Sequence, residues 1–308
     1  MNEKNLRYFD ISWFSAKDGP GTRTVLFLQG CHLRCPWCHS PQSQETTSPL
    51  LFFENRCLFC GACVSSCPHH VHAVENRIHT IDRTACRRCG ACVKNCPVSK
   101  NAKWNTGALG LAGIDGKPEE LFQLLRPQLA LLKNIGGLTV SGGEPLLQVE
   151  PLADLLTLCK RDGIHTAIET SASLPVQPVE SLIPLVDHWL IGLRPILNNE
   201  ATRTGDWTRV THNLERLVLS NRCQITIRTP IIPGYTDHIA CAQKIAETMK
   251  SFALSSIELL PYNRLSNHYY QAMNKPFPLE EHHEIRKPNI ESIRNYFADQ
   301  GFDINIID

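Results

Sequence analysis

Apolar residues along this chain alternate between short β-rich runs and longer amphipathic segments. The short runs predict six strands, at Thr24–Leu28, Leu138–Ser141, His165–Glu169, His188–Ile191, Gln224–Arg228 and Ser256–Leu260. The longer segments predict six helices, near Pro118–Lys133, Val149–Asp162, Val176–Val186, Thr208–Ser220, Asp237–Phe252 and Leu279–Gln300. A short closing strand is predicted at Asp303–Ile307. Strand–helix alternation of this kind indicates parallel βα units in an α/β fold.

Six such units are too few for a complete eight-fold barrel, so the expected architecture is a partial (β/α)6 TIM-like barrel. Each predicted strand is followed at once by a polar or glycine-rich group. These groups are the Cys31 loop, Ser141-Gly-Gly-Glu-Pro145, Glu169-Thr-Ser171, Gly192-Leu-Arg194, Arg228-Thr-Pro230 and Pro261-Tyr-Asn263. Because the carboxyl ends of parallel strands form the reactive face of such barrels, we expect these groups to converge on one site.

Cysteine content changes this picture. The 308 residues include 14 cysteines, and eleven of them lie between Cys31 and Cys96 in three tight groups. Disulfides are rare in the cytosol, where clustered thiols more often bind metal. The net charge of +1 indicates neither nucleic acid nor an acidic membrane as partner, and no signal peptide or apolar span is apparent, which predicts a cytoplasmic protein. Cys159, Cys223 and Cys241 are interpreted as ordinary buried thiols.

An internal repeat marks a separate module. Cys57-Leu-Phe-Cys60-Gly-Ala-Cys63-Val-Ser-Ser-Cys67-Pro recurs 29 residues later as Cys86-Arg-Arg-Cys89-Gly-Ala-Cys92-Val-Lys-Asn-Cys96-Pro. Residues 50–99 are therefore expected to form an insert, with residues 1–49 and 100–308 supplying the start and the remainder of the barrel.

Within this module, C-x2-C-x2-C-x3-C-P is the bacterial two-cluster ferredoxin pattern, in which the fourth cysteine of each run ligates the other cluster. One [4Fe–4S] cluster is thus predicted on Cys57, Cys60, Cys63 and Cys96, and a second on Cys86, Cys89, Cys92 and Cys67. Two four-cysteine zinc sites are the alternative, but the spacing and the two prolines favour clusters. His69, His70, His72 and His79 are interpreted as exposed loop histidines rather than ligands.

The remaining group, Cys31-His-Leu-Arg-Cys35-Pro-Trp-Cys38, is a C-x3-C-x2-C triad. Three thiolates can hold three irons of a [4Fe–4S] cube and leave the fourth iron open to a substrate. A zinc site with His32 or His39 as fourth ligand is the alternative, although zinc sites favour paired C-x2-C units.

These residues resemble a known superfamily. C-x3-C-x2-C after the first strand, followed by Gly142-Gly143-Glu144-Pro145, is similar to the signature of radical S-adenosylmethionine (SAM) enzymes. Asp18-Gly-Pro-Gly-Thr-Arg-Thr24, Gly30-Cys31 and Cys38-His-Ser-Pro-Gln42 resemble the opening of glycyl-radical-enzyme activating enzymes. Arg228-Thr-Pro-Ile-Ile-Pro-Gly234 and Leu259-Leu-Pro-Tyr-Asn263 resemble that family's later motifs, as does Glu169-Thr-Ser171, and the likeness covers about residues 8 to 275.

The resemblance implies a cofactor site. Its [4Fe–4S] cluster would be held by Cys31, Cys35 and Cys38, and its open iron would chelate the amino and carboxylate groups of SAM. Residues implied to bind SAM are Trp37, His39, Gly142, Gly143, Glu144, Glu169, Gly192, Arg194, Arg228 and Asn263. The chain departs from the family where Gly192-Leu-Arg194 replaces the usual Asp-x-Lys and where Asn263 replaces a common His.

The resemblance also implies a function. The enzyme would cleave SAM reductively to a 5′-deoxyadenosyl radical, which removes a hydrogen from a glycine of a partner glycyl radical enzyme. No catalytic side chain is expected beyond the three clusters and SAM. Flavodoxin or ferredoxin would be the reductant, and a monomer is expected. The alternatives are a radical SAM enzyme acting on another peptide or small molecule, and a non-catalytic electron-transfer protein.

Overall fold

The computed structural model describes residues 5–195, 205–262, 265–279 and 287–307. Two compact units make up the chain. The barrel unit contains residues 1–38, 114–263 and 278–308, and the cysteine unit contains residues 39–113 and 264–277.

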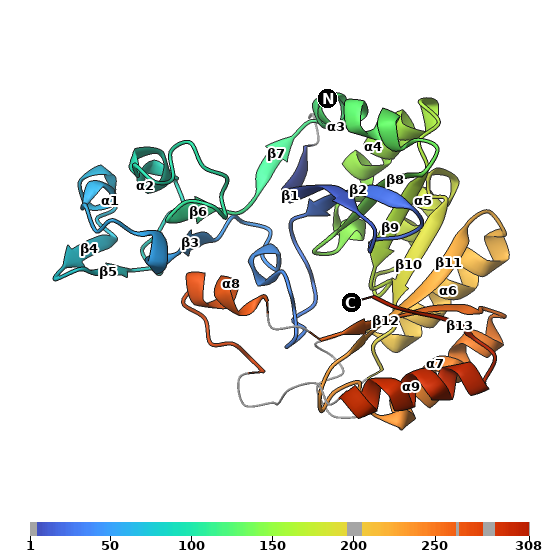
Figure 1. The fold of residues 1–308 in the computed structure, drawn as a ribbon. Coiled ribbons are helices and arrows are strands. Elements are labelled where there is room, and N and C mark those ends of the chain that lie inside the picture. The colour runs from blue at the N-terminus through green and yellow to red at the C-terminus, as the bar shows by residue number, and fades with distance from the viewer. Residues whose placement is uncertain (1–4, 196–204, 263–264, 280–286, 308) are drawn as a thin grey trace. The chain divides into compact units, whose positions relative to one another are not determined.

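A nine-stranded sheet forms the barrel unit, in the order β13-β12-β11-β10-β9-β8-β2-β1-β7 (Figure 1). Its strands are β1 (Leu6–Ser15), β2 (Thr22–Leu28), β7 (Ile114–Gly116), β8 (Gly136–Gly142), β9 (Thr166–Thr170), β10 (His188–Gly192), β11 (Gln224–Ile231), β12 (Ser256–Pro261) and β13 (Asp303–Ile306). All neighbours from β2 through β8 to β13 are parallel. The sheet ends at β13 and β7 and does not close, which confirms the predicted partial barrel.

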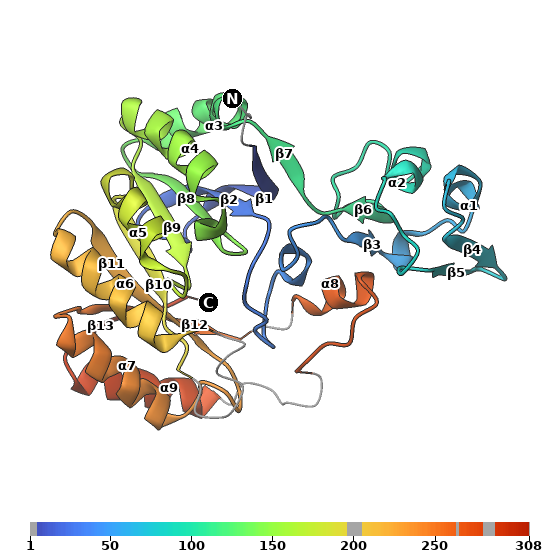
Figure 2. The same ribbon diagram turned by 180° about the vertical axis from the view of Figure 1, so that it is seen from behind.

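Helices follow the parallel strands in regular alternation and cover one face of the sheet (Figures 1 and 2). They are α3 (Pro118–Leu132), α4 (Val149–Arg161), α5 (Val176–Leu182), α6 (Trp207–Ser220), α7 (Ile239–Ser251) and α9 (Lys287–Asp299). Short 3-10 turns lie at η3 (Pro145–Gln148) and η4 (Ile183–Leu185). Within the described ranges, no helix combines the length and the apolar character needed to cross a membrane.

The two faces of the parallel strands differ in chemistry because successive side chains point to opposite sides. On the helix-covered face, residues such as Val140, Ile168 and Ile227 join the helices in one apolar core. The inner face instead carries Thr139, Ser141, Glu169, Thr226, Arg228 and Glu258. A barrel with a polar inner face toward the carboxyl ends of its strands is suited to hold a polar ligand there.

The six predicted parallel strands and the closing strand are confirmed, as are five of the six predicted helices. For the sixth, predicted over Leu279–Gln300, the structure gives α9 from Lys287, and residues 280–286 lie outside the described part. Strands β1 and β7 were not predicted. β1 pairs antiparallel with β2 through a register that shifts twice, so its polar and apolar positions do not alternate cleanly.

The cysteine unit is built from short elements. They are η1 (Pro41–Ser43), β3 (Leu50–Phe52), η2 (Glu54–Arg56), α1 (Ala62–Ser66), β4 (His72–Glu75), β5 (Ile78–Ile81), α2 (Ala91–Asn95), β6 (Leu109–Leu111) and α8 (Asn267–Ala272). β3 pairs with β6, and β4 pairs with β5. α1 and α2 are equivalent pieces of the repeat, and each begins after a glycine in the left-handed region. The apolar core of this unit is small, so a bound metal would add to its stability.

The barrel core permits a direct test of the fold on one helix. Leu129 of α3 is fully buried in the core, whereas Leu131 of the same helix is 75% exposed. We expect Leu129→Ala to lower the free energy of unfolding by about 2–5 kcal/mol, because it leaves a cavity. Leu131→Ala should change it by about 0.5 kcal/mol or less. Chemical denaturation of both variants checks the difference, and equal effects would contradict the packing of α3.

Candidate metal and cofactor sites

The Cys31–Cys38 loop leaves the carboxyl end of β2 and folds back on itself. The amide of Cys38 donates to the carbonyl of Cys35 at 3.1 Å, and the amide of Leu33 donates to Sγ of Cys31 at 3.4 Å. All three thiols of the triad are partly buried. Burial raises the pKa of Cys31 to about 11, and it also raises the pKa of Cys35. Both thiols must therefore lose a proton when they bind iron.

Gly142 and Gly143 hold this loop by close backbone contact with β2. The amide of Gly143 donates to the carbonyl of Leu28 at 2.8 Å, and the amide of Glu144 donates to the carbonyl of Gly30 at 2.8 Å. A Cβ atom at Gly142, where φ is +111°, would lie 2.4 Å from the nitrogen of Leu28, and one at Gly143 would lie 2.1 Å from the carbonyl oxygen of Gly30. The glycines are thus required to seat the end of β8 against the residue before Cys31.

The carboxylate of Glu144 is buried and receives four hydrogen bonds. Its Oε1 accepts from the Leu146 amide at 3.2 Å and the Thr170 hydroxyl at 2.6 Å. Its Oε2 accepts from the amide and the hydroxyl of Ser171 at 3.0 and 2.6 Å. Glu144 therefore fastens the end of β8 to the end of β9, a role that no sequence pattern indicated, while its charge acts on the nearby Cys31 thiol.

Arg228 lies at the centre of a buried charge network on the inner face. Its Nε donates to Glu258 at 2.6 Å, its Nη1 lies 3.1 Å from Glu169 and 3.9 Å from Asp18, and its Nη2 donates to the carbonyl of Lys17. Burial alone would raise the pKa of Glu169, but Arg228 and the Ser141 hydroxyl hold it below its ordinary value. The predicted SAM contacts Glu169 and Arg228 thus bind each other and the loop before β2.

Arg194 folds back over Gly192. A Cβ at Gly192 would lie 2.6 to 2.8 Å from the three outer atoms of the Arg194 guanidinium. That guanidinium also lowers the pKa of Cys31 and Cys35, against the larger effect of burial. Gly192 and Arg194, which replace the aspartate and the lysine of the family's Asp-x-Lys, are therefore one feature, because the missing side chain at position 192 leaves the space that the arginine fills.

The other predicted contacts lie apart. Trp37 is 5% exposed, and its ring packs edge-on against Tyr235, with the ring centroids 5.4 Å apart. His39 begins the cysteine unit, directly after Cys38. Asn263 lies outside the described residues. Cys159 and Cys241 are buried and Cys223 is partly buried, as expected of ordinary thiols.

Two small cavities in the cysteine unit are lined by the predicted crossed ligand sets. One is lined by Cys57, Cys60, Cys63 and Cys96, together with Val74 and His79. The other is lined by Cys67, Cys86, Cys89 and Cys92, together with Leu50 and His72. Each cavity thus takes three cysteines from one repeat and the fourth from the other, as a two-cluster ferredoxin requires.

The spacing of the thiols disfavours zinc. Zn–S bonds of about 2.3 Å in a tetrahedron bring the sulfur atoms to within about 3.8 Å of one another. In the described part of the chain, the one group of three or more metal-ligating side chains with ligand atoms within 4.8 Å of one another is Cys63, His72 and His79. Neither the Cys31 triad nor the two sets of four cysteines closes so tightly, whereas a cube of iron and sulfide holds its thiolates farther apart.

Two histidines differ from the prediction. His72 and His79 are only 5% and 7% exposed, so their interpretation as exposed loop residues was wrong. They lie on the paired strands β4 and β5, where pairing turns both side chains toward the cavities. His69 and His70 are exposed as predicted. A period-2 pattern in His72–Glu75 and Ile78–Ile81 could have indicated the strands, but both runs are very short.

Comparison with known proteins identifies the family. Residues 50–97 match the model of the 4Fe-4S dicluster domain, and residues 17–59 match that of the 4Fe-4S single cluster domain. The chain is 37% identical over 266 residues to the benzylsuccinate synthase activating enzyme of Thauera aromatica, covering 82% of this chain and 77% of that protein. It is 34% identical over 282 residues to the isethionate sulfite-lyase activating enzyme of Desulfovibrio desulfuricans, covering 89% and 88%. This chain belongs to the glycyl-radical-enzyme activating enzymes.

A third activating enzyme extends the likeness to the whole chain. The choline trimethylamine-lyase activating enzyme of Oleidesulfovibrio alaskensis is 29% identical over 318 residues, covering 100% of this chain and 99% of that protein. The chain is accordingly a radical SAM enzyme that contains [4Fe–4S] clusters and uses SAM. The donor sets described above fit these groups, since each cavity offers four thiols and the Cys31 loop offers three.

The charge network of the activating enzyme can be tested by stability. We expect Arg228→Met to lower the free energy of unfolding by about 3–5 kcal/mol, because it leaves the partly buried carboxylates of Asp18, Glu169 and Glu258 without their cation. Arg126→Met removes an exposed pair with Asp162 and should cost about 1 kcal/mol or less. Denaturant titration of the two variants measures both effects. A loss below about 1 kcal/mol for Arg228→Met would show that the network does not stabilise the barrel.

Proposed function

We propose that this activating enzyme holds three [4Fe–4S] clusters and forms a glycyl radical in a partner enzyme. Cys31, Cys35 and Cys38 would hold the SAM cluster, and the two crossed cysteine sets would hold the auxiliary clusters. The observation that carries the proposal is the convergence at the carboxyl ends of β2, β8 and β10. There the triad loop is seated by Gly142-Gly143-Glu144 and is electrostatically coupled to Arg194.

The cofactors supply the chemistry. When bound, the reduced cluster supplies the electron that splits SAM into methionine and a 5′-deoxyadenosyl radical, which takes a hydrogen atom from a glycine α-carbon. The protein's own residues would position SAM and neutralise its carboxylate. The thiolates of Cys31, Cys35 and Cys38 would hold three irons of the cluster, so that the fourth would be free to take the amino and carboxylate groups of SAM. Arg194 would offer a forked cation to that carboxylate or to the ribose, where the family usually has a lysine.

Other parts of the site would act by shape. Trp37, at the end of the triad loop, would lie beside the adenine, where a buried aromatic ring excludes water. The Arg228 network would keep the loop before β2 folded onto the inner face rather than contact SAM directly. His39 and Asn263 remain candidate contacts from the family motif alone.

The auxiliary clusters would relay electrons from an outside donor. Flavodoxin or ferredoxin is the proposed donor, and the cytoplasm is the proposed compartment, because thiol-held clusters need reducing conditions. We propose a monomer that binds its partner enzyme transiently.

Cleavage of SAM tests the first step. Protein reconstituted anaerobically with iron and sulfide should hold about twelve irons. After reduction with dithionite and addition of SAM, it should release 5′-deoxyadenosine, which chromatography detects. Cys35→Ala should hold about eight irons and release none. Cys223→Ala, at a partly buried thiol outside the three sets, should match the parent protein.

Two negative results of this assay contradict different parts of the proposal. If the fully loaded parent protein releases no 5′-deoxyadenosine, the radical SAM activity is contradicted. If Cys35→Ala retains the activity, the triad does not hold the active cluster.

The hydrogen donor tests the second step. A peptide carrying the glycine loop of a candidate partner, made with α-deuterated glycine, should transfer deuterium to 5′-deoxyadenosine, which mass spectrometry detects. The same peptide with alanine in place of that glycine is the control. Deuterium transfer from a deuterated small molecule but not from the peptide would favour another radical SAM activity.

Substitution at Gly192 should change SAM binding without changing the stability of the protein. Gly192→Ala should leave the melting temperature within a few degrees, because the Cβ meets only the movable end of Arg194. It should nevertheless raise the KM for SAM about tenfold, because the guanidinium is displaced. Arg194→Lys should raise that KM less than Arg194→Gln. Unchanged KM values in all three variants would exclude Arg194 from the SAM site.

A further inference from the structure

The two auxiliary sites are not equivalent, although the repeat makes their cysteines equivalent. His79 lines the first cavity and His72 lines the second. Both histidines lie on the hairpin of β4 and β5, between the first copy of the repeat, which ends at Pro68, and the second, which begins at Cys86. The two cavities therefore differ in the side chains around their equivalent cysteines.

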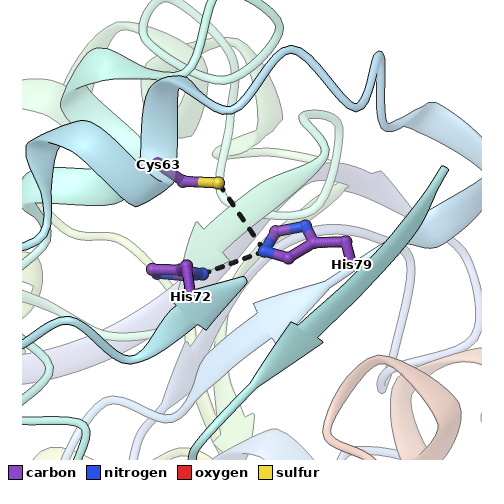
Figure 3. A group of neighbouring side chains, drawn as sticks. All are labelled: Cys63, His72 and His79. Carbon is purple, nitrogen blue, oxygen red and sulfur yellow. Dashed lines mark hydrogen bonds between the residues drawn. The ribbon is translucent and has the colours of Figure 1, made fainter. Parts of the chain in front are cut away.

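A hydrogen bond joins the two imidazoles. Nδ1 of His72 lies 2.9 Å from Nε2 of His79, and Figure 3 shows the rings facing each other from the two strands of a hairpin. Nε2 of His79 also lies 3.6 Å from Sγ of Cys63, and Nδ1 of His79 lies 3.8 Å from Sγ of Cys57. His79 thus rests against the first cysteine set.

One ring nitrogen of the pair has no partner within the protein, and its residue, His72, lines the second cavity. Nε2 of His72 is buried and makes no hydrogen bond within the protein. As an N–H, this atom would cost about 1–3 kcal/mol if it were left without an acceptor. In the cavity lined by His72, the acceptors that the ligand set implies are the sulfur atoms of the second cluster.

A hydrogen bond donated by Nε2 of His72 would fix both tautomers. If His72 donates from Nε2, its Nδ1 carries a lone pair and must accept a proton from Nε2 of His79. His79 then orients His72 and fixes its tautomer, as carboxylates and carbonyls do for metal-ligating histidines. Hydrogen bonds to cluster sulfurs are among the factors that set the reduction potential.

We propose that His72, positioned by His79, donates a hydrogen bond to a sulfur of the cluster on Cys67, Cys86, Cys89 and Cys92, and thereby raises its reduction potential above that of the cluster on Cys57, Cys60, Cys63 and Cys96. The proposal rests on the ligand sets proposed above. On this proposal, the second cluster is reduced before the first.

The residues between the cysteines act in the same direction. Arg87 and Arg88 lie between the first two cysteines of the second set, where the first set has Leu58 and Phe59. Cations near a cluster favour its reduced, more negative form. Both arginines are exposed, so water and salt weaken their effect, whereas the buried His72 is not screened in this way.

Redox titration followed by electron paramagnetic resonance tests the proposal on the full-length, iron-loaded protein. His72→Leu should decrease the reduced-to-oxidised ratio of one auxiliary cluster about tenfold at a given potential, equal to about 59 mV for one electron. Cys89→Ser identifies which couple belongs to the second cluster. His79→Leu should shift the same couple less, because His72 remains but is no longer oriented. His212→Leu, at an exposed position on α6, should shift neither.

Each other outcome overturns the proposal. If the reduction potential of the second cluster is unchanged in fully loaded His72→Leu, the hydrogen bond is excluded. If only the potential of the first cluster shifts, His72 acts on that cluster and the proposal is wrong. Should His72→Leu fail to load iron, an unshifted second couple in His79→Leu would be decisive against it. Stoichiometric zinc on Cys63, His72 and His79 would show a separate metal site. Parent protein with about four irons would instead refute the auxiliary ligand sets themselves.

Discussion

The barrel site depends on the contact between the end of β8 and the end of β2. Two glycines allow the backbone at Gly142 and Gly143 to lie directly against Leu28–Gly30, with no room for a Cβ at either position. Glu144 then continues the connection to β9 through the hydroxyls of Thr170 and Ser171. Three strand ends are thereby locked together, and the triad loop begins at the residue after this lock. A cofactor that needs three thiols at fixed positions requires this rigidity.

A second constraint is electrostatic. The inner face holds Arg228 with three carboxylates around it, and this network also binds the loop that precedes β2. Buried charges are costly unless they are paired and hydrogen-bonded. Arg23, which is fully buried, acts similarly on the carbonyls of Pro20 and Leu138. Asp18 and the carbonyl of Pro20, both in the Asp18-Gly-Pro-Gly segment of the family motif, are thus bound to arginines of the inner face.

The cysteine unit is stabilised differently from the barrel unit. Its elements are short, and its cysteines surround two cavities instead of an apolar core of ordinary size. Binding of the clusters supplies the stabilisation that a larger core gives to other domains. The repeat makes the cysteines of the two cavities equivalent but not the residues around them. The pair His72 and His79 and the two arginines Arg87 and Arg88 distinguish one cavity from the other. If each cavity holds a cluster, as proposed, such differences would give the two clusters different reduction potentials.

The sequence by itself determined the parallel βα units and the family, and it predicted the cysteine sets that line the two cavities. Strand and helix periods are local, and ligand spacing within a loop survives in the primary structure. Tertiary structure decided which polar residues bind one another. Glu169 and Arg228 are 59 residues apart and pair only because β9 and β11 flank β10. Gly192 and Arg194 act together because the Arg194 side chain folds back over Gly192, which depends on the tertiary structure. The burial of His72 and His79 likewise depends on the pairing of two four-residue strands, which are too short for a period to be read.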